Sequence, residues 1–478
     1  MPHSTPTVIG ALLLALTPLA FASSSASAAA VRCDGKRATI VSGAEQVTGM
    51  AKRVTGTAKD DVIVVTGRGS AVVAAGAGDD TICLRTRGTT LVRAGNGDDT
   101  VLSQERRGRP DVLLGPGDDT YSGSGGSDLV RETHARGGRA GGVDTIRTRG
   151  GDDFVMIGPR RGANLDTVDL GSGDDSLMVV GKAGSGARLT GGPGTDVLSL
   201  YVARRARLAV DAQHGTATVA DESYLRWSAF DAYELFAKGT QSFTGSTGDD
   251  TVGFIGPGSI SATMGGGDDT VATSPIIGHA AGLVDGGEGD DALKYLTESD
   301  IVGDTTTGQV TAGGTTLTMA SVERLAARTS GSVSLTGSDG NDDLRAEGCA
   351  VTLRGGAGND HLVSGQDPED DAFTIAFSSA EPQRCTAPTS NVQGEAGDDV
   401  LVGNDVYSSW SGRRSRPRQT VLDGGDGVDV AVGMTSRGRT TCIAETRVSC
   451  GPERAQSLGQ APAPTTPSSL PHYRRYLD

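Results

Sequence analysis

Aspartate is the residue type in this chain that is best placed to bind a ligand, because an Asp ends a glycine-rich segment that recurs along the sequence. The template is Gly-Gly-x-Gly-x-Asp-x-U, in which U is a large apolar residue. Complete or nearly complete copies occupy residues 75–82, 94–101, 114–121, 191–198, 286–293, 355–362 and 424–431. Partial copies occupy residues 123–130, 149–155, 170–177, 245–252, 264–271, 337–344 and 394–401. So many copies indicate a repeat architecture.

The residue types in one copy suit a hard metal ion. Glycines reach backbone angles that are closed to other residues, so the first half of the copy can turn tightly with its carbonyl groups facing one point. The Asp adds a carboxylate oxygen beside those carbonyls, and this is the ligand set that Ca²⁺ prefers. We therefore expect calcium ligands at the sixth-position carboxylates, which are Asp80, Asp99, Asp119, Asp128, Asp153, Asp175, Asp196, Asp250, Asp269, Asp291, Asp343, Asp360, Asp399 and Asp429.

The spacing of the copies predicts where the ions lie. Two nonapeptides make a coil of about eighteen residues, so turns that far apart should stack on one edge of a solenoid. The steps from Asp80 to Asp99 and from Asp99 to Asp119 are 19 and 20 residues, whereas the step from Asp119 to Asp128 is nine. A nine-residue step should place its two carboxylates on opposite edges. We expect one well-kept edge and one eroded edge.

Carboxylates stacked in this way need a cation. Neighbouring coils are about 4.8 Å apart, and at an effective dielectric constant near 20 two negative charges at that distance repel by roughly 3.5 kcal/mol. A metal ion between successive turns reverses the sign of this contribution. The sequence therefore predicts that calcium binding is coupled to folding.

The elements that position these turns are expected to be short β-strands. Alternating pairs such as Thr81-Ile82 follow the Asp, which is typical of a strand with one inward side chain per turn. The chain has 478 residues, of which 72 are Gly and only 4% are aromatic, a poor composition for an ordinary globular core of this size. A solenoid needs fewer large apolar side chains, because each coil buries only a few apolar residues against its neighbours. The net charge of −16 argues against nucleic acid as a partner.

The repeat resembles the RTX, or hemolysin-type, calcium-binding repeat over most of residues 53–435. The resemblance implies an all-β fold, namely a right-handed parallel β-roll or β-helix solenoid with degenerate coils. It also implies that Ca²⁺ is held between successive turns by turn carbonyls and by the sixth-position Asp. Several copies depart from the template, with Ala, Leu or Met for the first Gly, or with Lys59 for the fourth-position Gly in residues 56–63. We expect those turns to bind weakly or to be plain structural turns.

Shifts in composition divide the chain into seven segments. They are, in order, a signal peptide (1–30), an N-terminal cap (31–53), RTX-like calcium repeats (54–198), interval coils with further repeats (199–291), a second copy of that arrangement with an insert (292–436), a C-terminal cap with a Cys pair (437–451) and a disordered tail (452–478). The two interval segments resemble each other, which indicates an internal duplication of about 93 residues. We expect the intervals to be longer coils without a calcium turn.

The N-terminal segment and the cysteines indicate export. Residues 8–22 are apolar but too short to span a membrane, and small residues suited to cleavage follow them. A membrane anchor is the competing interpretation, and we expect a secreted, extracellular protein with no membrane span in its mature form. Six cysteines fit an oxidising compartment, and their order favours the pairs Cys33–Cys83, Cys349–Cys385 and Cys442–Cys450 among fifteen possible pairings, with zinc as the alternative for the last pair.

Signatures of catalysis are missing from the sequence. It contains neither H-E-x-x-H nor G-x-S-x-G, so we expect no enzyme but a secreted calcium-binding protein with a structural, adhesive or cell-surface role. A calcium-dependent polysaccharide lyase or epimerase on the same solenoid is the alternative, and a C-terminal secretion device is disfavoured by the N-terminal signal. Trp410 and four arginines in residues 407–418 indicate a solvated basic loop or a contact with an acidic glycan or cell-surface partner.

Overall fold

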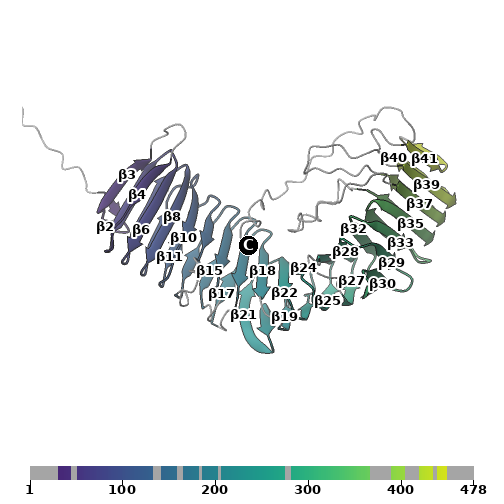
Figure 1. The fold of residues 1–478 in the computed structure, drawn as a ribbon, viewed down its shortest axis with the longest axis horizontal. Coiled ribbons are helices and arrows are strands. Elements are labelled where there is room, and N and C mark those ends of the chain that lie inside the picture. The colour runs from purple at the N-terminus through teal and green to yellow at the C-terminus, as the bar shows by residue number, and fades with distance from the viewer. Residues whose placement is uncertain are drawn as a thin grey trace, which may run out of the picture.

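The structure is a computed structural model, and it describes residues 31–44, 51–132, 142–158, 165–181, 186–202, 206–274, 281–365, 389–403, 419–433 and 439–448. The predicted signal peptide, the predicted disordered tail and the Trp410 segment lie outside the described residues. Within the described ranges, every regular element is a β-strand (Figure 1).

Most strands belong to two long sheets, and the chain alternates between them as it winds along an arc-shaped molecule (Figure 1). The inner sheet lies on the concave side, and each of its strands is parallel to its neighbours. Its strands are β4 (Lys52–Thr55), β6 (Ala71–Ala77), β8 (Thr89–Asn96), β10 (Arg109–Leu113), β12 (Leu129–Arg131), β14 (Phe154–Ile157), β16 (Ser176–Val180), β18 (Val197–Val202), β22 (Ala232–Ala237), β24 (Thr251–Ile255), β26 (Thr270–Ser274), β28 (Ala292–Thr297), β32 (Arg324–Thr329), β34 (Asp343–Glu347), β36 (His361–Ser364), β38 (Val400–Gly403), β40 (Val430–Gly433) and β42 (Thr446–Val448).

The outer sheet lies on the convex side and is parallel except at two places described below. Its strands, in chain order, are β3 (Ile40–Ala44), β5 (Val62–Gly67), β7 (Thr81–Thr86), β9 (Thr100–Ser103), β11 (Thr120–Ser122), β13 (Thr145–Arg147), β15 (Thr167–Asp169), β17 (Arg188–Thr190), β19 (Leu208–Asp211), β20 (Thr216–Val219), β21 (Glu222–Ser228), β23 (Gln241–Thr244), β25 (Ile260–Gly266), β27 (Gly282–Glu288), β29 (Ile301–Asp304), β30 (Gln309–Ala312), β31 (Thr315–Ala320), β33 (Ser332–Thr336), β35 (Ala350–Ala357), β37 (Thr389–Ala396), β39 (Gln419–Asp426) and β41 (Arg439–Ile443). The all-β parallel solenoid predicted from the repeats is therefore confirmed.

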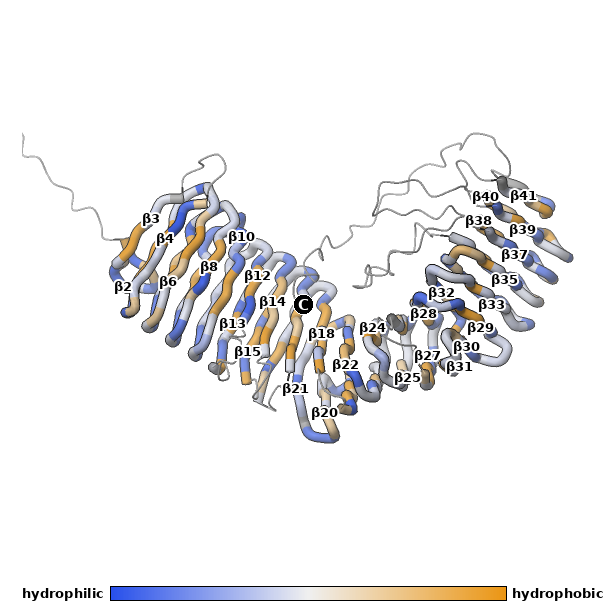
Figure 2. The backbone as a smooth tube through the Cα atoms, in the orientation of Figure 1, coloured by the Kyte–Doolittle hydropathy of each residue, from blue (hydrophilic) through white to orange (hydrophobic). Residues whose placement is uncertain are grey.

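The core is a thin layer between the two sheets. Val73, Val92 and Val112 pair in register on successive inner-sheet strands, and all three are fully buried. Arg93, one residue further along β8, points away from the core and is exposed. This alternation of apolar and polar residues runs along the strands of both arms (Figure 2). Each coil thus supplies a few apolar side chains to one continuous core, as expected for a solenoid.

Glycine is required in the turns because successive turns stack closely. Gly95 and Gly97 have φ angles of 133° and 125°, a region that is strained for other residues. A Cβ atom on Gly95 would lie 2.1 Å from the carbonyl oxygen of Gly76 in the preceding coil, and a Cβ on Gly97 would lie 2.3 Å from that of Gly78. The repeated glycines therefore allow the backbone of one turn to lie directly on the next.

Two segments interrupt the parallel outer sheet. In each, the chain folds back on itself as a three-stranded antiparallel meander, β19–β20–β21 and β29–β30–β31. The second hairpin of each meander closes through two residues of positive φ, Ala220-Asp221 (53° and 64°) and Gly313-Gly314 (55° and 79°). This geometry matches the twist of paired strands. The predicted interval coils are therefore meanders rather than longer coils.

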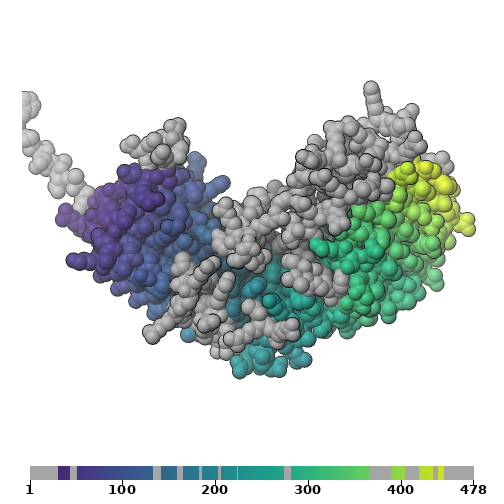
Figure 3. Space-filling view, in the orientation of Figure 1, coloured from purple at the N-terminus to yellow at the C-terminus, as the bar shows by residue number. Residues whose placement is uncertain are grey.

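The meanders explain the bend of the molecule. Between β17 and β23 the outer sheet holds three strands where the inner sheet holds only β22, and the same excess recurs between β27 and β33, opposite β32. Two extra strands widen the outer sheet by roughly 10 Å at each place. Because only one side widens, the solenoid curves toward the inner sheet, as Figures 1 and 3 show.

A short hairpin covers the outer face of the first coils. It consists of β1 (Arg32–Cys33) and β2 (Lys36–Arg37). Cys33 forms a disulfide with Cys83 of β7, and the Lys36 Nζ donates a hydrogen bond to Thr81 Oγ1 at 2.9 Å. The predicted Cys33–Cys83 pair is therefore confirmed. The remaining two cysteines of the described residues, Cys349 and Cys442, are also disulfide-bonded, and their predicted partners lie outside the described ranges.

Candidate metal-binding turns

Acidic residues stand immediately before the strands and form two rows. The first acidic row precedes the outer-sheet strands β5 to β15 and consists of Asp61, Asp80, Asp99, Asp119, Asp144 and Asp166. The second acidic row precedes every inner-sheet strand from β12 to β42 and consists of Asp128, Asp153, Asp175, Asp196, Asp231, Asp250, Asp269, Asp291, Glu323, Asp342, Asp360, Asp399, Asp429 and Glu445.

The two rows lie on opposite edges of the solenoid. Asp119 precedes β11 of the outer sheet, and Asp128, nine residues on, precedes β12 of the inner sheet, as the nine-residue step predicted. Both edges carry carboxylates from Asp128 to Asp166, where the first row ends. The acidic turn therefore changes edges partway along the molecule, which differs from the expected single well-kept edge.

Hydrogen bonds link the members of each row from coil to coil. The Oδ1 atom of a row carboxylate accepts the backbone N–H of the row residue in the preceding coil. The N–H of Asp80 donates to Asp99 and that of Asp99 donates to Asp119, both at 2.8 Å. In the second row, the N–H of Asp153 donates to Asp175 at 2.7 Å. One oxygen of most row carboxylates is thus committed to the stacking of coils, and the exceptions, such as Asp128, are the first members of a series.

The other carboxylate oxygen is buried and has no hydrogen-bond partner in most members of the rows. The Oδ2 atom is in this state in Asp80, Asp99, Asp119, Asp128, Asp144, Asp153, Asp175, Asp196, Asp269, Asp291, Asp360, Asp399 and Asp429. Burying a charged oxygen without a partner is costly, and native proteins rarely do so. The same orphaned atom recurs in coil after coil, so both rows could hold the same kind of cation.

Carbonyl oxygens lie beside these orphaned oxygens. A Cβ atom on Gly355, the first residue of its turn, would lie 2.1 Å from Asp360 Oδ2 and 2.6 Å from the carbonyl oxygen of Gly394 in the next coil. A Cβ on Gly394 would lie 2.1 Å from Asp399 Oδ2 and 2.4 Å from the carbonyl oxygen of Gly424. Carboxylate and carbonyl oxygens therefore converge beside the first Gly. This donor set, made only of oxygen, fits Ca²⁺.

In three turns a backbone N–H of the same turn already donates to the second carboxylate oxygen, so these turns are less suited to a cation. The Oδ2 atoms of Asp61, Asp250 and Asp342 accept the backbone N–H groups of Thr57, Ser246 and Ser338 at 2.7, 2.6 and 2.7 Å. In each case Ser or Thr replaces the second-position Gly, and the turn is the first of a series in its row. Asp250 was among the predicted ligands, and its second oxygen is already bonded within its own turn.

Asp343 does not belong to either row, which corrects its prediction as a metal ligand. The row residue at this coil is Asp342, whose N–H donates to Asp360 Oδ1 at 2.9 Å. Asp343 is the first residue of β34, and its carboxylate accepts a hydrogen bond from Arg345 Nη2 at 2.8 Å. Burial alone would raise the pKa of Asp343, but hydrogen bonds from His361 and Arg345 hold it at about 2. The alternation of β34 turns this side chain outward.

The structure adds carboxylates that sequence reasoning missed. The row members that had no repeat signal are Asp166, Asp231, Glu323 and Glu445, while Asp61, Asp144 and Asp342 lie in or beside repeat copies but were not among the predicted ligands. Asp231 and Glu323 continue the second row across the two meanders, where they accept the N–H groups of Asp196 and Asp291 at 2.9 and 2.8 Å. They lack the glycine template, so the only sequence signal was an acidic residue directly before a strand.

Burial and neighbouring charge raise the pKa values of several row carboxyls, whereas hydrogen bonds from Thr57 and Thr39 lower that of Asp61. Desolvation is the largest cause, and adjacent carboxylates add to it. The pKa is raised to about 7 in Asp99 and Asp119 and to about 9 in Asp153. Hydrogen bonds from backbone N–H groups act in the opposite direction but do not offset the burial. A bound cation would favour the ionised form of these groups.

Fifth-position side chains form a different ladder on the surface. The N–H of Asp98 donates to Asp79 Oδ1 at 2.9 Å, so this ladder runs in the direction opposite to that of the sixth position. An amide serves equally well here, since the N–H of Asn359 donates to Asn341 Oδ1 at 2.8 Å. The fifth position thus needs an acceptor at most. The second row, by contrast, contains only Asp and Glu.

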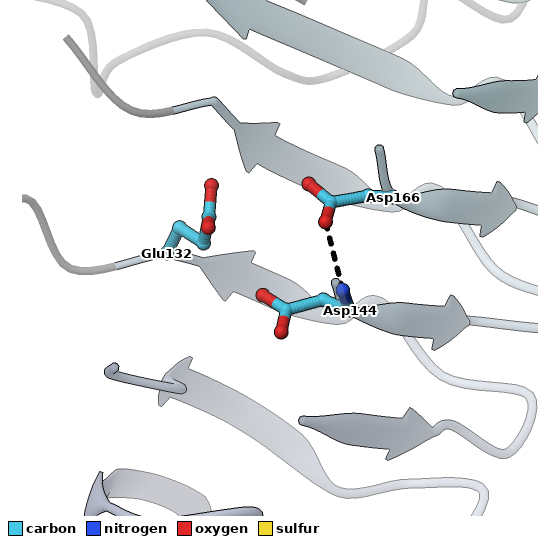
Figure 4. Close-up of side chains that lie close together, drawn as sticks. All are labelled: Glu132, Asp144 and Asp166. Atoms are coloured by element: carbon cyan, nitrogen blue, oxygen red, sulfur yellow. Dashed lines mark hydrogen bonds between the residues drawn. The ribbon is translucent and has the colours of Figure 1, made fainter. Parts of the chain in front are cut away.

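One further group of carboxylates joins the first row. Glu132 lies with Asp144 and Asp166 in a buried cluster whose ligand oxygens are all within 4.8 Å of one another (Figure 4). Burial and the charge of Asp166 raise the pKa of Glu132 to about 7, and burial with neighbouring carboxylates raises that of Asp144 to about 9. Glu132 follows a strand instead of preceding one, so the repeat template gave no signal for it.

No model of a protein family matches this chain, and a search of curated proteins found no match either. Among the described residues there is no helix of the length and apolar character needed to cross a membrane.

Proposed function

We propose that this protein is a secreted, calcium-binding β-solenoid with a structural, adhesive or cell-surface role, and that it folds stably only with Ca²⁺ in its turns. One observation carries the proposal. In the described part of the chain, all fourteen inner-sheet strands from β12 to β42 follow an Asp or Glu. The residue before that acidic residue varies and includes Ser127, Thr195 and Val428. Selection for a hydrogen-bond acceptor alone would also admit Asn, Ser or Thr.

The donor chemistry favours calcium over other metals. The row sites offer carboxylate and backbone carbonyl oxygens, and the one His next to a described row residue, His361, lies 3.5 Å from Asp343 outside the row. Oxygen donors suit Ca²⁺ and Mg²⁺, whereas zinc sites use nitrogen and sulfur. Mg²⁺ requires a small octahedral shell and retains its waters, so turns fixed by stacked backbone suit the larger ion. Bound calcium would pair with the orphaned carboxylate oxygens and remove their mutual repulsion.

The surface favours a structural or binding role over catalysis. The charged cavity on the inner sheet between β26 and β34 has a volume of about 50 Å³, far below the roughly 300–1,000 Å³ typical of small-molecule sites. Its lining residue Arg345 is paired with Asp343, and Arg324 lies 3.1 Å from Asp290. A wider hollow of about 540 Å³ lies over the turns beside β23, β25 and β27, and its volume is typical of a small-molecule site. Glu288 is its only charged lining residue, so it lacks the basic partner expected for the carbohydrate-active alternative, which activity against acidic polysaccharides would test. A long arc with a parallel sheet along each side suits contact with an extended partner such as an acidic glycan or a cell surface.

Calcium binding by the full chain tests the proposal. Flow dialysis of metal-depleted protein should detect several equivalents of bound Ca²⁺, most of them with dissociation constants near 10⁻⁴–10⁻³ M, the range of extracellular calcium modules. A tenfold excess of Mg²⁺ should displace little of it. Retention of less than one equivalent at about 5 mM Ca²⁺ would contradict the proposal.

A further inference from the structure

Glu132 occupies a position that belongs to the core in neighbouring coils. Strand pairing aligns it with Ala94, Leu114 and Ile157, all of which are fully buried apolar residues. Glu132 is itself only 4% exposed. An acidic side chain at an inward-facing core position is unfavourable unless something neutralises it. Its presence therefore calls for a local explanation.

Two row carboxylates lie beside Glu132 at the place where both edges of the solenoid are acidic. Glu132 follows β12 of the inner sheet, whereas Asp144 and Asp166 precede β13 and β15 of the outer sheet. The ligand oxygens of the three lie within 4.8 Å of one another, and Figure 4 shows the carboxyl groups facing a common space. Asp144 and Asp166 are 0% and 1% exposed.

The contacts of the cluster leave one oxygen aimed into it without a partner. Glu132 Oε2 accepts the N–H of Gly158 at 2.6 Å, and Asp144 Oδ1 accepts the N–H of Asp119 at 2.9 Å. Both donors are neutral amides. Asp144 Oδ2 is buried and has no hydrogen-bond partner. The arrangement therefore combines three acidic groups with an orphaned oxygen in a space that protein groups shield from water.

We propose that Glu132, Asp144 and Asp166 form one site for a single hard cation, namely Ca²⁺, in which Glu132 adds a third carboxylate to two carboxylates of the first acidic row. Glu132 stands where the repeat has an apolar residue or Gly, so the site differs from the other turns in this extra ligand, and it rests on the proposed function for its two row ligands. Calcium affinity rises with the number of charged ligands. This site should therefore bind at least about tenfold more tightly than a turn with one carboxylate per coil. A bound ion would tie β12 of the inner sheet to two successive turns of the outer sheet.

Calcium titration of charge-neutral variants tests the proposal on the full, metal-depleted chain. In Glu132→Gln the side chain keeps an acceptor for the Gly158 N–H but loses its charge. Glu234→Gln is the matched control, because Glu234 is 2% exposed and bonds to Ser199 Oγ at 2.6 Å. By isothermal titration calorimetry, the wild type and Glu234→Gln should show one equivalent of calcium that binds before the others. Glu132→Gln should lose that equivalent and keep the weaker ones.

Thermal unfolding gives a second measurement that separates a metal ligand from a structural group. Without metal, Glu132→Gln should unfold at a higher temperature than the wild type because repulsion within the cluster is relieved; with calcium it should unfold at a lower temperature. If Glu132→Gln does not fold, Glu132→Leu restores the residue type that Leu114 supplies one coil away and should show the same reversal. A titration identical to that of the wild type, or equal shifts in both media, would overturn the site.

The two proposals fail separately. Loss of the single tight equivalent in Glu132→Gln with the weaker class intact supports this site and the calcium-binding turns together. A single tight equivalent with no weaker class would support this site and contradict the turns. A weaker class of calcium sites without any tight equivalent in the wild type would support the turns and contradict this site.

Discussion

At the scale of single residues, two neighbouring side chains in each turn have different tasks. The fifth-position side chain is exposed and accepts one backbone N–H, a task that Asn341 and Asp98 perform alike. The sixth-position carboxylate accepts one N–H with one oxygen and buries the other without a partner, as in Asp99. Under the proposed function, the negative charge is needed only at the sixth position, where it would pair with a cation.

The variant Asp99→Asn tests this difference, with Asp98→Asn as its control. Asn at position 99 retains an acceptor for the Asp80 N–H but removes the charge. With calcium bound, we expect Asp99→Asn to lower the free energy of unfolding by about 3 kcal/mol, the cost of removing one partner of a buried ionic contact. Asp98→Asn should change it by less than about 0.5 kcal/mol. Chemical denaturation with calcium measures both, and equal effects of the two variants would contradict the assignment.

Gly355 tests the convergence of oxygens beside the first residue of a turn. A Cβ atom there would meet Asp360 Oδ2 and the carbonyl oxygen of Gly394 at 2.1 and 2.6 Å, whereas a Cβ on Gly340 would meet only Ser338 Oγ at 3.5 Å. Gly355→Ala should therefore destabilise the calcium-bound protein by about 1–3 kcal/mol and weaken calcium binding. Gly340→Ala should be close to neutral in both respects. Thermal unfolding and calcium titration of the pair provide the measurements, and an unchanged Gly355→Ala variant would refute the predicted crowding.

At the scale of elements, burial within the acidic rows makes the stability of the metal-free fold depend on pH. Burial raises the pKa of Asp99 and Asp119 to about 7 and that of Asp153 to about 9, whereas an unfolded Asp titrates near 3.9. Between about pH 4 and pH 9 the metal-free folded state therefore binds more protons than the unfolded state. Its stability is greatest at the acidic end of this window and is lost as the pH rises through the folded-state values.

We expect the melting temperature of the metal-free protein to fall between about pH 5 and about pH 8. With saturating calcium the carboxylates are held ionised, so the fall should disappear or reverse. Differential scanning calorimetry at both pH values, in metal-depleted buffer and in buffer with calcium, is the measurement. A metal-free melting temperature that rises with pH would show that the row carboxyls are not buried together as described.

The repeated turns and the strands between them could be predicted from the sequence, because glycine and the residues after Asp report directly on backbone conformation and burial. The edge change could also be inferred in part, from the nine-residue step between Asp119 and Asp128. Asp231 and Glu323 could not be predicted as row members, because they follow no glycine turn. The pairing of β22 and β32 with their neighbours places them in the row. The inward position of Glu132 depends on strand register as well, because the register of β12 sets which way the residue after it points.

Each meander has a local sequence pattern that predicts its first turn. Asp211 and Asp304 each end a strand, and each accepts the backbone N–H of the residue three positions on, His214 at 3.0 Å and Thr307 at 2.9 Å. Such turns reverse the chain. The Asp-x-x-x-Gly pattern of both intervals therefore predicts a hairpin, but whether a hairpin adds strands to the sheet or leaves it depends on long-range pairing.

At the scale of the whole molecule, attraction and repulsion between successive coils oppose each other along the solenoid axis. The apolar core and the strand ladders hold successive coils together, while two rows of carboxylates push them apart by roughly 3.5 kcal/mol per adjacent ionised pair. In the proposed function, a cation in each turn would convert that repulsion into attraction. The arc, set by extra outer-sheet strands at the two meanders, should therefore form completely only when calcium is bound.

The most direct measurement is circular dichroism combined with small-angle X-ray scattering on the full chain as free calcium is varied. The solenoid should be compact, β-rich and heat-resistant in about 5 mM Ca²⁺ and expanded in chelator, with a midpoint near 10⁻⁴–10⁻³ M. The meanders carry antiparallel pairs, so some β-structure should persist without the ion. An unchanged spectrum and an unchanged radius of gyration between chelator and calcium would contradict the central claim that calcium in the acidic rows drives folding.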